Sequence, residues 1–105
     1  MTQTEKILAR IKKMVIAVEP GSTIILYGSY ARGDNRADSD IDLLILLDKD
    51  QVTFKDKKRI TYPLFDLEFE TGQIISPLVF AKKDWETRHR ITPLYHNILR
   101  EGKVL

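Results

Sequence analysis

The sequence lacks cysteine and long apolar segments, and each absence excludes a class of protein. Without cysteine among its 105 residues, the chain can form no disulfide, no thiolate metal site and no thiol nucleophile. The apolar run at 43–47 is far shorter than the ~20 residues that cross a bilayer. We therefore expect a soluble, cytoplasmic protein that is not exported and does not contact a membrane.

A strong charge of one sign is also missing, because 17 basic and 15 acidic residues give a net charge of only +2. No basic stripe with interleaved aromatic side chains follows one element, so direct binding of nucleic acid is not expected. We interpret the charged stretch at 55–59 as a solvated helix start or loop rather than a patch for polyphosphate. His89 and His96 do not lie at a spacing that predicts a metal site.

The length and the 43% hydrophobic content indicate a single globular domain over residues 1–105, with one core. Apolar residues at helical spacing predict a first helix over about 4–18. A last helix is predicted from Thr92-Pro93, which reads as an N-cap followed by proline at the first helical position. The lone Trp85 is interpreted as an anchor of the core.

Three apolar, partly β-branched runs predict strands. They cover residues 22–27, the run 41–47 and residues 74–80. Pro77 lacks a backbone donor for the sheet, so we expect the third strand at an edge or at a bulge.

Residues 64–70 fit two patterns. Apolar and acidic residues alternate there as in a strand, whereas the apolar residues together with Ile60 also form one face of a helix. Pro63 is compatible with either pattern, as the first residue of a helix or as a strand boundary. The spacing alone leaves both open.

Two features in the stretch 28–47 predict chemistry. Gly28 and Ser29 follow the first strand and open a short helical turn, where a phosphate can approach the backbone and accept bonds from free amides and a hydroxyl. Asp40 and Asp42 are two residues apart, so on an extended strand both carboxylates project from one face. Two carboxylates this close repel each other, and a bound divalent cation such as Mg²⁺ or Mn²⁺ relieves the repulsion.

A resemblance to a known family rests on two segments, Gly-Ser-Tyr-Ala-Arg-Gly at 28–33 and Ser-Asp-Ile-Asp-Leu at 39–43. They resemble the signature of the polymerase-beta-like nucleotidyltransferase superfamily, and most closely its minimal nucleotidyltransferase branch. The segment 93–102 also resembles small bacterial members of that branch. The resemblance implies an α/β (α+β) fold with a small mixed sheet of three to four strands flanked by helices, and it favours a helix over about 56–71.

The resemblance also implies roles for individual residues. Gly28, Ser29 and Ser39 would bind a nucleoside triphosphate, with ATP as the expected donor. Asp40 and Asp42 would be the catalytic residues and the ligands of Mg²⁺ or Mn²⁺. The reaction would be in-line transfer of a nucleoside monophosphate to a hydroxyl group.

A third carboxylate is the missing part of this pattern. Active members of the family usually carry one more acid on a neighbouring strand, and the expected register places Ser76 at that position. If residues 64–70 formed a strand, Asp66, Glu68 or Glu70 could supply the acid instead. The third metal ligand therefore stays unassigned.

Several functions fit the resemblance. Stand-alone chains of this kind resemble the antitoxin of a toxin–antitoxin pair, in which the partner, encoded by an adjacent gene, is a HEPN-type RNase modified on a tyrosine. The alternative is a catalytically weak or inactive binding module that neutralises such a toxin by complex formation. Either function is compatible with a homo- or hetero-oligomer. Modification of small molecules is a further hypothesis, although enzymes of that type usually need an additional C-terminal domain.

Overall fold

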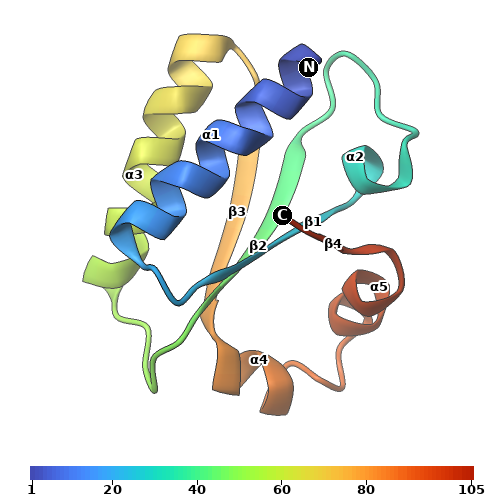
Figure 1. Ribbon diagram of the computed structural model, residues 1–105. Coiled ribbons are helices and arrows are strands. Elements are labelled where there is room, and N and C mark those ends of the chain that lie inside the picture. The colour runs from blue at the N-terminus through green and yellow to red at the C-terminus, as the bar shows by residue number, and fades with distance from the viewer.

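A four-stranded mixed sheet forms the centre of the structure, a computed structural model that describes residues 1–105 (Figure 1). The elements follow in the order α1 (Gln3–Val18), β1 (Thr23–Tyr27), α2 (Ser29–Arg32), β2 (Ile41–Leu47), α3 (Phe54–Thr71), β3 (Ile75–Ala81), α4 (Lys82–Thr87), α5 (Pro93–Glu101) and β4 (Lys103–Val104). The strand order is β3-β2-β1-β4. Strand β2 is parallel to β3, and β1 is antiparallel to both β2 and β4. The predicted fold class is confirmed.

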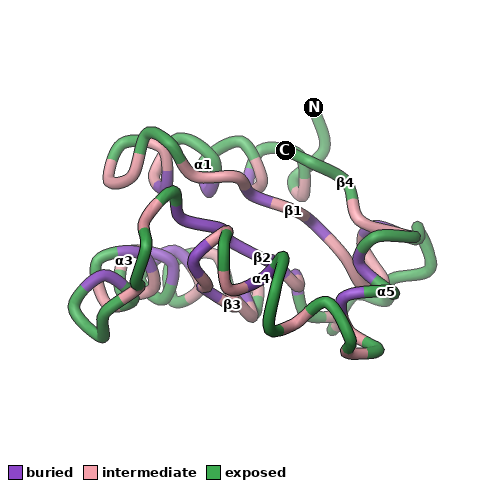
Figure 2. Tube along the Cα trace, turned by 90° about the horizontal axis from the view of Figure 1, so that it is seen from below, coloured by how far each residue is buried: buried purple, intermediate pink, exposed green.

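Alternation along the strands divides the core between the two faces of the sheet. Residues such as Leu43 and Ile45 on β2 face α1 and α3 and belong to the larger core cluster. Leu44 and Leu46 point to the other face, where they pack with Trp85 of α4 and with residues of α5. Trp85 is 3% exposed, which confirms it as a core anchor. Figure 2 shows the buried strands between the helices.

The three longer helices begin at capping residues. Thr2 and Glu5 form a capping box at α1, so this helix begins one residue before the predicted start. Thr53 forms the same box with Asp56 at the start of α3. The amide of Thr53 and the ammonium of Lys49 lower the pKa of Asp56 to about 2, so this carboxylate keeps its charge at a lower pH than an ordinary aspartate does.

The predicted helical start of α5 is also confirmed. The hydroxyl of Thr92 accepts a hydrogen bond from the amide of Tyr95, and Pro93 is the first helical residue. Proline fits this position because the first helical amides have no partner within the helix.

Residues 64–70 form part of α3, so the helical prediction is confirmed and the strand alternative is wrong. The buried residues Ile60, Leu64 and Leu67 recur at helical spacing and pack against the sheet. Tertiary burial of this face outweighs the local alternation of apolar and acidic residues. The two interpretations of Pro63 are also wrong, because it lies in the interior of the helix.

Strand β3 lies at the edge of the sheet, as the proline at position 77 predicted. Two elements were not predicted. Strand β4 has only two residues and α4 only six, so neither is long enough to produce a readable periodicity. None of the helices combines the length and the apolar character that a membrane crossing requires.

Candidate functional site

The turn between β1 and α2 lies directly against a carboxylate of β2. Gly28 has φ 74° and ψ −157°, a region of backbone conformation that is essentially restricted to glycine. A Cβ atom at this position would lie 2.3 Å from Oδ2 of Asp42. Glycine at position 28 is therefore required both by the conformation of the turn and by the close approach of the aspartate.

Helix α2 consists of a single turn that follows this glycine. The carbonyl of Gly28 accepts hydrogen bonds from the amides of Ala31 and Arg32, both at 3.1 Å. The amides of Ser29 and Tyr30 precede these bonds and have no acceptor within the helix. The turn can therefore offer backbone donors, and the hydroxyl of Ser29, to an anion beside Gly28.

Asp40, Asp42 and Ser76 meet where β2 and β3 begin. In the parallel pairing, Asp42 lies opposite Ser76, and the Ser76 hydroxyl donates a hydrogen bond of 3.2 Å to Oδ2 of Asp40. Because side chains alternate along a strand, Asp42 shares its sheet face with Leu44 and Leu46. This is the face that α4 and α5 cover.

The electrostatics of the carboxylate pair favour the approach of a positive charge. Burial, and then the neighbouring charge of Asp40, raise the pKa of Asp42. The positive charge of Arg32 opposes this effect but does not outweigh it, and the charge of Glu101 adds to the rise. Neither aspartate takes part in any of the chain's ion pairs. Two unneutralised carboxylates beside free amide donors are a suitable donor set for a hard divalent cation that also contacts phosphate oxygens.

The expected register of Ser76 is confirmed, so a hydroxyl group occupies the place where a third acid was sought. The acids of α3 do not substitute for it, because this helix packs on the opposite face of the sheet from Asp42, and two of the three acids have other partners. Glu68 accepts a hydrogen bond of 2.8 Å from the amide of Ile75, and Glu70 pairs with Arg10. No group of three His, Cys, Asp or Glu side chains comes together in the chain.

Ser39 lies in the loop before β2. It forms hydrogen bonds with Arg36 and Gln73, which the sequence did not indicate as its partners. Its hydroxyl accepts a hydrogen bond of 2.8 Å from the amide of Arg36. Its carbonyl accepts one of 2.9 Å from the side-chain amide of Gln73, whose Oε1 in turn accepts one of 3.0 Å from Tyr30. Gln73 thus connects the loop to α2. A nucleotide-binding role of Ser39 itself stays a prediction.

A second connection that the sequence did not indicate joins α2 to the end of α5. The guanidinium of Arg32 contacts Glu101 at 2.8 Å and Asp34 at 3.1 Å. Glu101 is the more buried of the two acids, with 17% of its side chain exposed. Residues 69 positions apart therefore meet close to Asp42.

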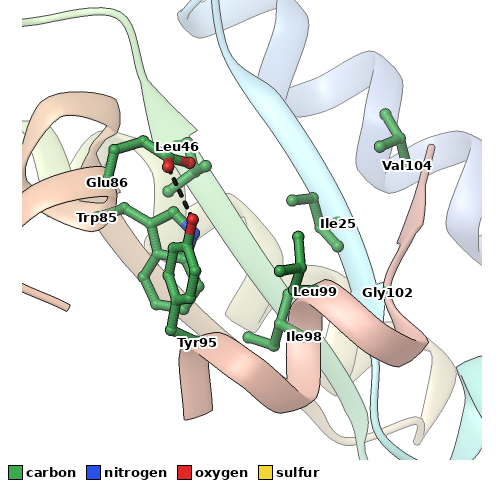
Figure 3. A pocket seen from close by; sticks show the side chains of 9 residues that line it. All are labelled: Ile25, Leu46, Trp85, Glu86, Tyr95, Ile98, Leu99, Gly102 and Val104. Atoms are coloured by element: carbon green, nitrogen blue, oxygen red, sulfur yellow. Dashed lines mark hydrogen bonds between the residues drawn. The ribbon is translucent and has the colours of Figure 1, made fainter. Parts of the chain in front are cut away.

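An apolar pocket of about 200 Å³ lies between α5 and the first two strands (Figure 3). Figure 3 shows Ile98 and Leu99 of α5 beside Ile25, and Tyr95 beside Trp85 with its hydroxyl directed at Glu86. The Tyr95 hydroxyl donates a hydrogen bond of 2.8 Å to Glu86. Neither aspartate lines this pocket. Its volume is below the ~300–1,000 Å³ typical of small-molecule sites, so we interpret it as a gap in packing rather than as the nucleotide site.

Comparison with protein families gives a match over most of the chain. The model described as "Nucleotidyltransferase domain" matches residues 4–96. Three relatives from Methanocaldococcus jannaschii carry provisional names as protein adenylyltransferases. One is 41% identical over 59 residues, which are 56% of this chain and 59% of that relative. The others are 34% and 28% identical and cover 78% and 87% of this chain, and 75% and 81% of their own lengths.

Two solved structures share the fold. One, described as a toxin-antitoxin with AMP-PNP, has a TM-score of 0.65 and 22% identity, and the match covers 91% of this chain and 69% of that one. The other, a mutant of the toxin-antitoxin MntA-HpeT, has a TM-score of 0.64 and 20% identity over the same shares. At these identities the likeness concerns the arrangement of helices and strands.

Proposed function

Because the chain belongs to the nucleotidyltransferase domain family, we propose that it transfers AMP from ATP to a hydroxyl group of a partner protein. The observation that carries this proposal is the contact between Gly28 and Asp42. It joins a turn suited to phosphate and a strand that carries two carboxylates into one site. The proposed unit is a single domain over residues 1–105, acting in the cytoplasm.

The proposed reaction needs an anion site and an acceptor in line with it. The amides of the turn and the hydroxyl of Ser29 would hold the triphosphate, while Gly28 allows the phosphates to approach the backbone. A bond forms between the acceptor oxygen and the α-phosphorus, and the bond from that phosphorus to pyrophosphate breaks. The acceptor hydroxyl gives up its proton to solvent, and pyrophosphate leaves with the electron pair of the broken bond.

Asp40 and Asp42 would hold Mg²⁺ or Mn²⁺ together with the phosphate oxygens. A bound cation would polarise the phosphate and neutralise charge on the leaving group. The raised pKa of Asp42 supports this assignment, because it comes from burial and then from the charge of Asp40, and a bound cation would offset both effects. Ser76 would orient Asp40 through their hydrogen bond.

The proposed acceptor is a tyrosine on a HEPN-type toxin encoded by an adjacent gene. Two observations support a protein acceptor. The relatives are named as protein adenylyltransferases, and the structural neighbours are described as toxin-antitoxin proteins, one of them with a bound ATP analogue. The motif resemblance supports the HEPN-type partner.

The test is the intact mass of the adjacent-gene product after incubation with the chain, ATP and Mg²⁺. We expect the partner to gain one AMP residue per modified hydroxyl, and Asp42→Asn to lower the rate of gain at least about a hundredfold, because a charged ligand is lost. Asp50→Asn, which removes an exposed acid in the loop after the far end of β2, is the matched control. An equal mass gain with the Asp42→Asn variant would contradict the assignment of the site.

A second candidate function is neutralisation of the toxin by binding alone, and the observation that favours it is Ser76 in place of a third acid. The two functions are distinguished by comparing toxin neutralisation with the mass gain of the toxin, in wild type and in the aspartate double variant. If the Asp40→Asn/Asp42→Asn double variant still neutralises the toxin fully and wild type adds no mass to it, binding is the function. If neutralisation requires the aspartates and follows the mass gain, transfer is the function.

A further inference from the structure

Helix α3 carries a row of exposed aromatic residues that no other element covers. Phe54, Tyr62, Phe65 and Phe69 form this row, which we call the α3 stripe; they are 72%, 55%, 46% and 94% exposed. Three of the chain's four phenylalanines are therefore in contact with solvent on one helix. Soluble proteins seldom expose contiguous apolar patches of this kind unless the patch binds something.

The stripe lies opposite the buried face of the same helix. Ile60, Leu64 and Leu67 fix that face against the core, and helical periodicity places the aromatic residues on the outside. Lys58 fills the gap in the row, with its ammonium 4.5 Å from the ring centre of Phe54 and 6.0 Å from that of Tyr62. The lysine side chain thus bridges the two rings along the helix.

The charges beside the stripe are divided between the two halves of the helix. The first half carries Lys55, Lys57, Lys58 and Arg59, and the second half carries Asp66, Glu68 and Glu70. Arg59, Glu68 and Glu70 already have partners within the chain. Lys55 and Asp66, on the exposed side, take part in none of its ion pairs.

We propose that the α3 stripe is the interface of a two-fold symmetric dimer, in which α3 of one copy packs antiparallel on α3 of the other. A two-fold interface must be complementary to itself. Antiparallel packing meets that condition here, because the basic half of each helix then faces the acidic half of its neighbour. Tyr62 lies at the middle of α3, so the two copies cross there.

The expected area and geometry fit a dimer of moderate affinity. With aromatic side chains burying about 150–250 Å² each, the exposed parts of the stripe in two copies remove on the order of 1,000 Å² from water. Specific interfaces begin near that area. At ~1.5 Å rise per residue, Lys55 of one copy and Asp66 of the other lie about one helical turn apart along the axis, within reach of the lysine.

The dimer leaves the candidate active site open. Helix α3 packs on the sheet face that contains Leu43 and Ile45, whereas Asp42 shares the opposite face with Leu44. Association through α3 and the binding of ATP are therefore independent, and each can fail without the other.

Sedimentation of the purified chain over a range of concentrations tests the dimer. We expect a species of twice the chain mass of 12.2 kDa, which dissociates more readily in high salt because the charge pairs are at the surface. Phe69→Ser should weaken association at least about tenfold, since each dimer loses two aromatic contacts. Ile91→Ser, at an equally exposed apolar residue outside α3, is the matched control and should leave it unchanged.

A charge exchange tests the antiparallel arrangement. Lys55→Glu alone and Asp66→Lys alone should each weaken the dimer, and the double variant should restore it because the opposite charges meet again. Circular dichroism would confirm that each variant is folded. A chain that stays monomeric at every concentration would overturn the proposal, as would a dimer that Phe69→Ser does not weaken. Loss of binding to a different partner protein by α3 variants of a monomeric chain would assign the stripe to that partner instead.

Discussion

Replacing Gly28 by alanine should destabilise the chain and abolish its binding of ATP with Mg²⁺. The backbone at Gly28 is in a region that costs a residue with a side chain about 1–3 kcal/mol. For a domain of this size, that cost corresponds to a fall in Tm of roughly 5–20 °C. The new Cβ would also displace Oδ2 of Asp42, which lies 2.3 Å from its position. The phosphate turn and a metal ligand would therefore be altered by one methyl group.

Gly33→Ala is the matched control for that experiment. Gly33 also has a positive φ, of 83°, but nothing lies within 4 Å of an added Cβ. This variant should lose about 1 kcal/mol of stability from its backbone conformation and keep its binding of ATP. Melting curves with and without ATP and Mg²⁺ separate the two effects. If both variants kept the ligand-induced rise in Tm, Gly28 would have no special role in the site.

Replacing Ser76 by aspartate should strengthen the binding of divalent cations about tenfold or more, because a third carboxylate would then face the pair Asp40 and Asp42. In the presence of EDTA the same change should lower the Tm, since three neighbouring carboxylates repel one another. The expected result is a chain that is less stable without metal and gains more from Mn²⁺ or Mg²⁺ than wild type. Melting temperatures across a metal titration measure both effects.

Ser76→Asn keeps the approximate size of aspartate without its charge and serves as the control. It should not increase the response to metal. If Ser76→Asp changed neither the stability in EDTA nor the metal response, the side chain at position 76 would not face the aspartates as the register indicates. The measurement needs no knowledge of the acceptor.

The parts of the site that are close in sequence could be predicted, and the parts that join distant segments could not. Gly28 and Asp42 belong to one short stretch in which turn and strand signals are both local. Even the position of Ser76 could be anticipated, because the register of a buried strand is restricted by its alternation. The contact between Tyr30 and Gln73 joins residues 43 positions apart. A hydrophobic periodicity within one segment cannot predict a contact between two distant segments.

The secondary structure was likewise predictable where its signals are local and not where it depends on contacts between distant segments. Amphipathic helices with threonine caps were predictable, because their signals lie within a few residues of each other. Residues 64–70 were ambiguous locally, and burial of Leu64 and Leu67 against the sheet decided the helix. The two-residue strand β4 depends wholly on its pairing with β1, which the sequence of that segment does not encode.

The Gly28 turn and the aspartate pair are proposed to form one site for a triphosphate and its cation. Calorimetric titration of the chain with ATP, in Mg²⁺ and in EDTA, measures whether they do. We expect binding that requires Mg²⁺ and is lost in the Asp40→Asn/Asp42→Asn variant. Binding should also weaken on acidification at a higher pH than an ordinary aspartate would cause, because the raised pKa of Asp42 leaves it protonated there. Equal binding in EDTA, or Mg²⁺-dependent binding that survives in the double variant, would show that the two aspartates do not hold the cation of the triphosphate.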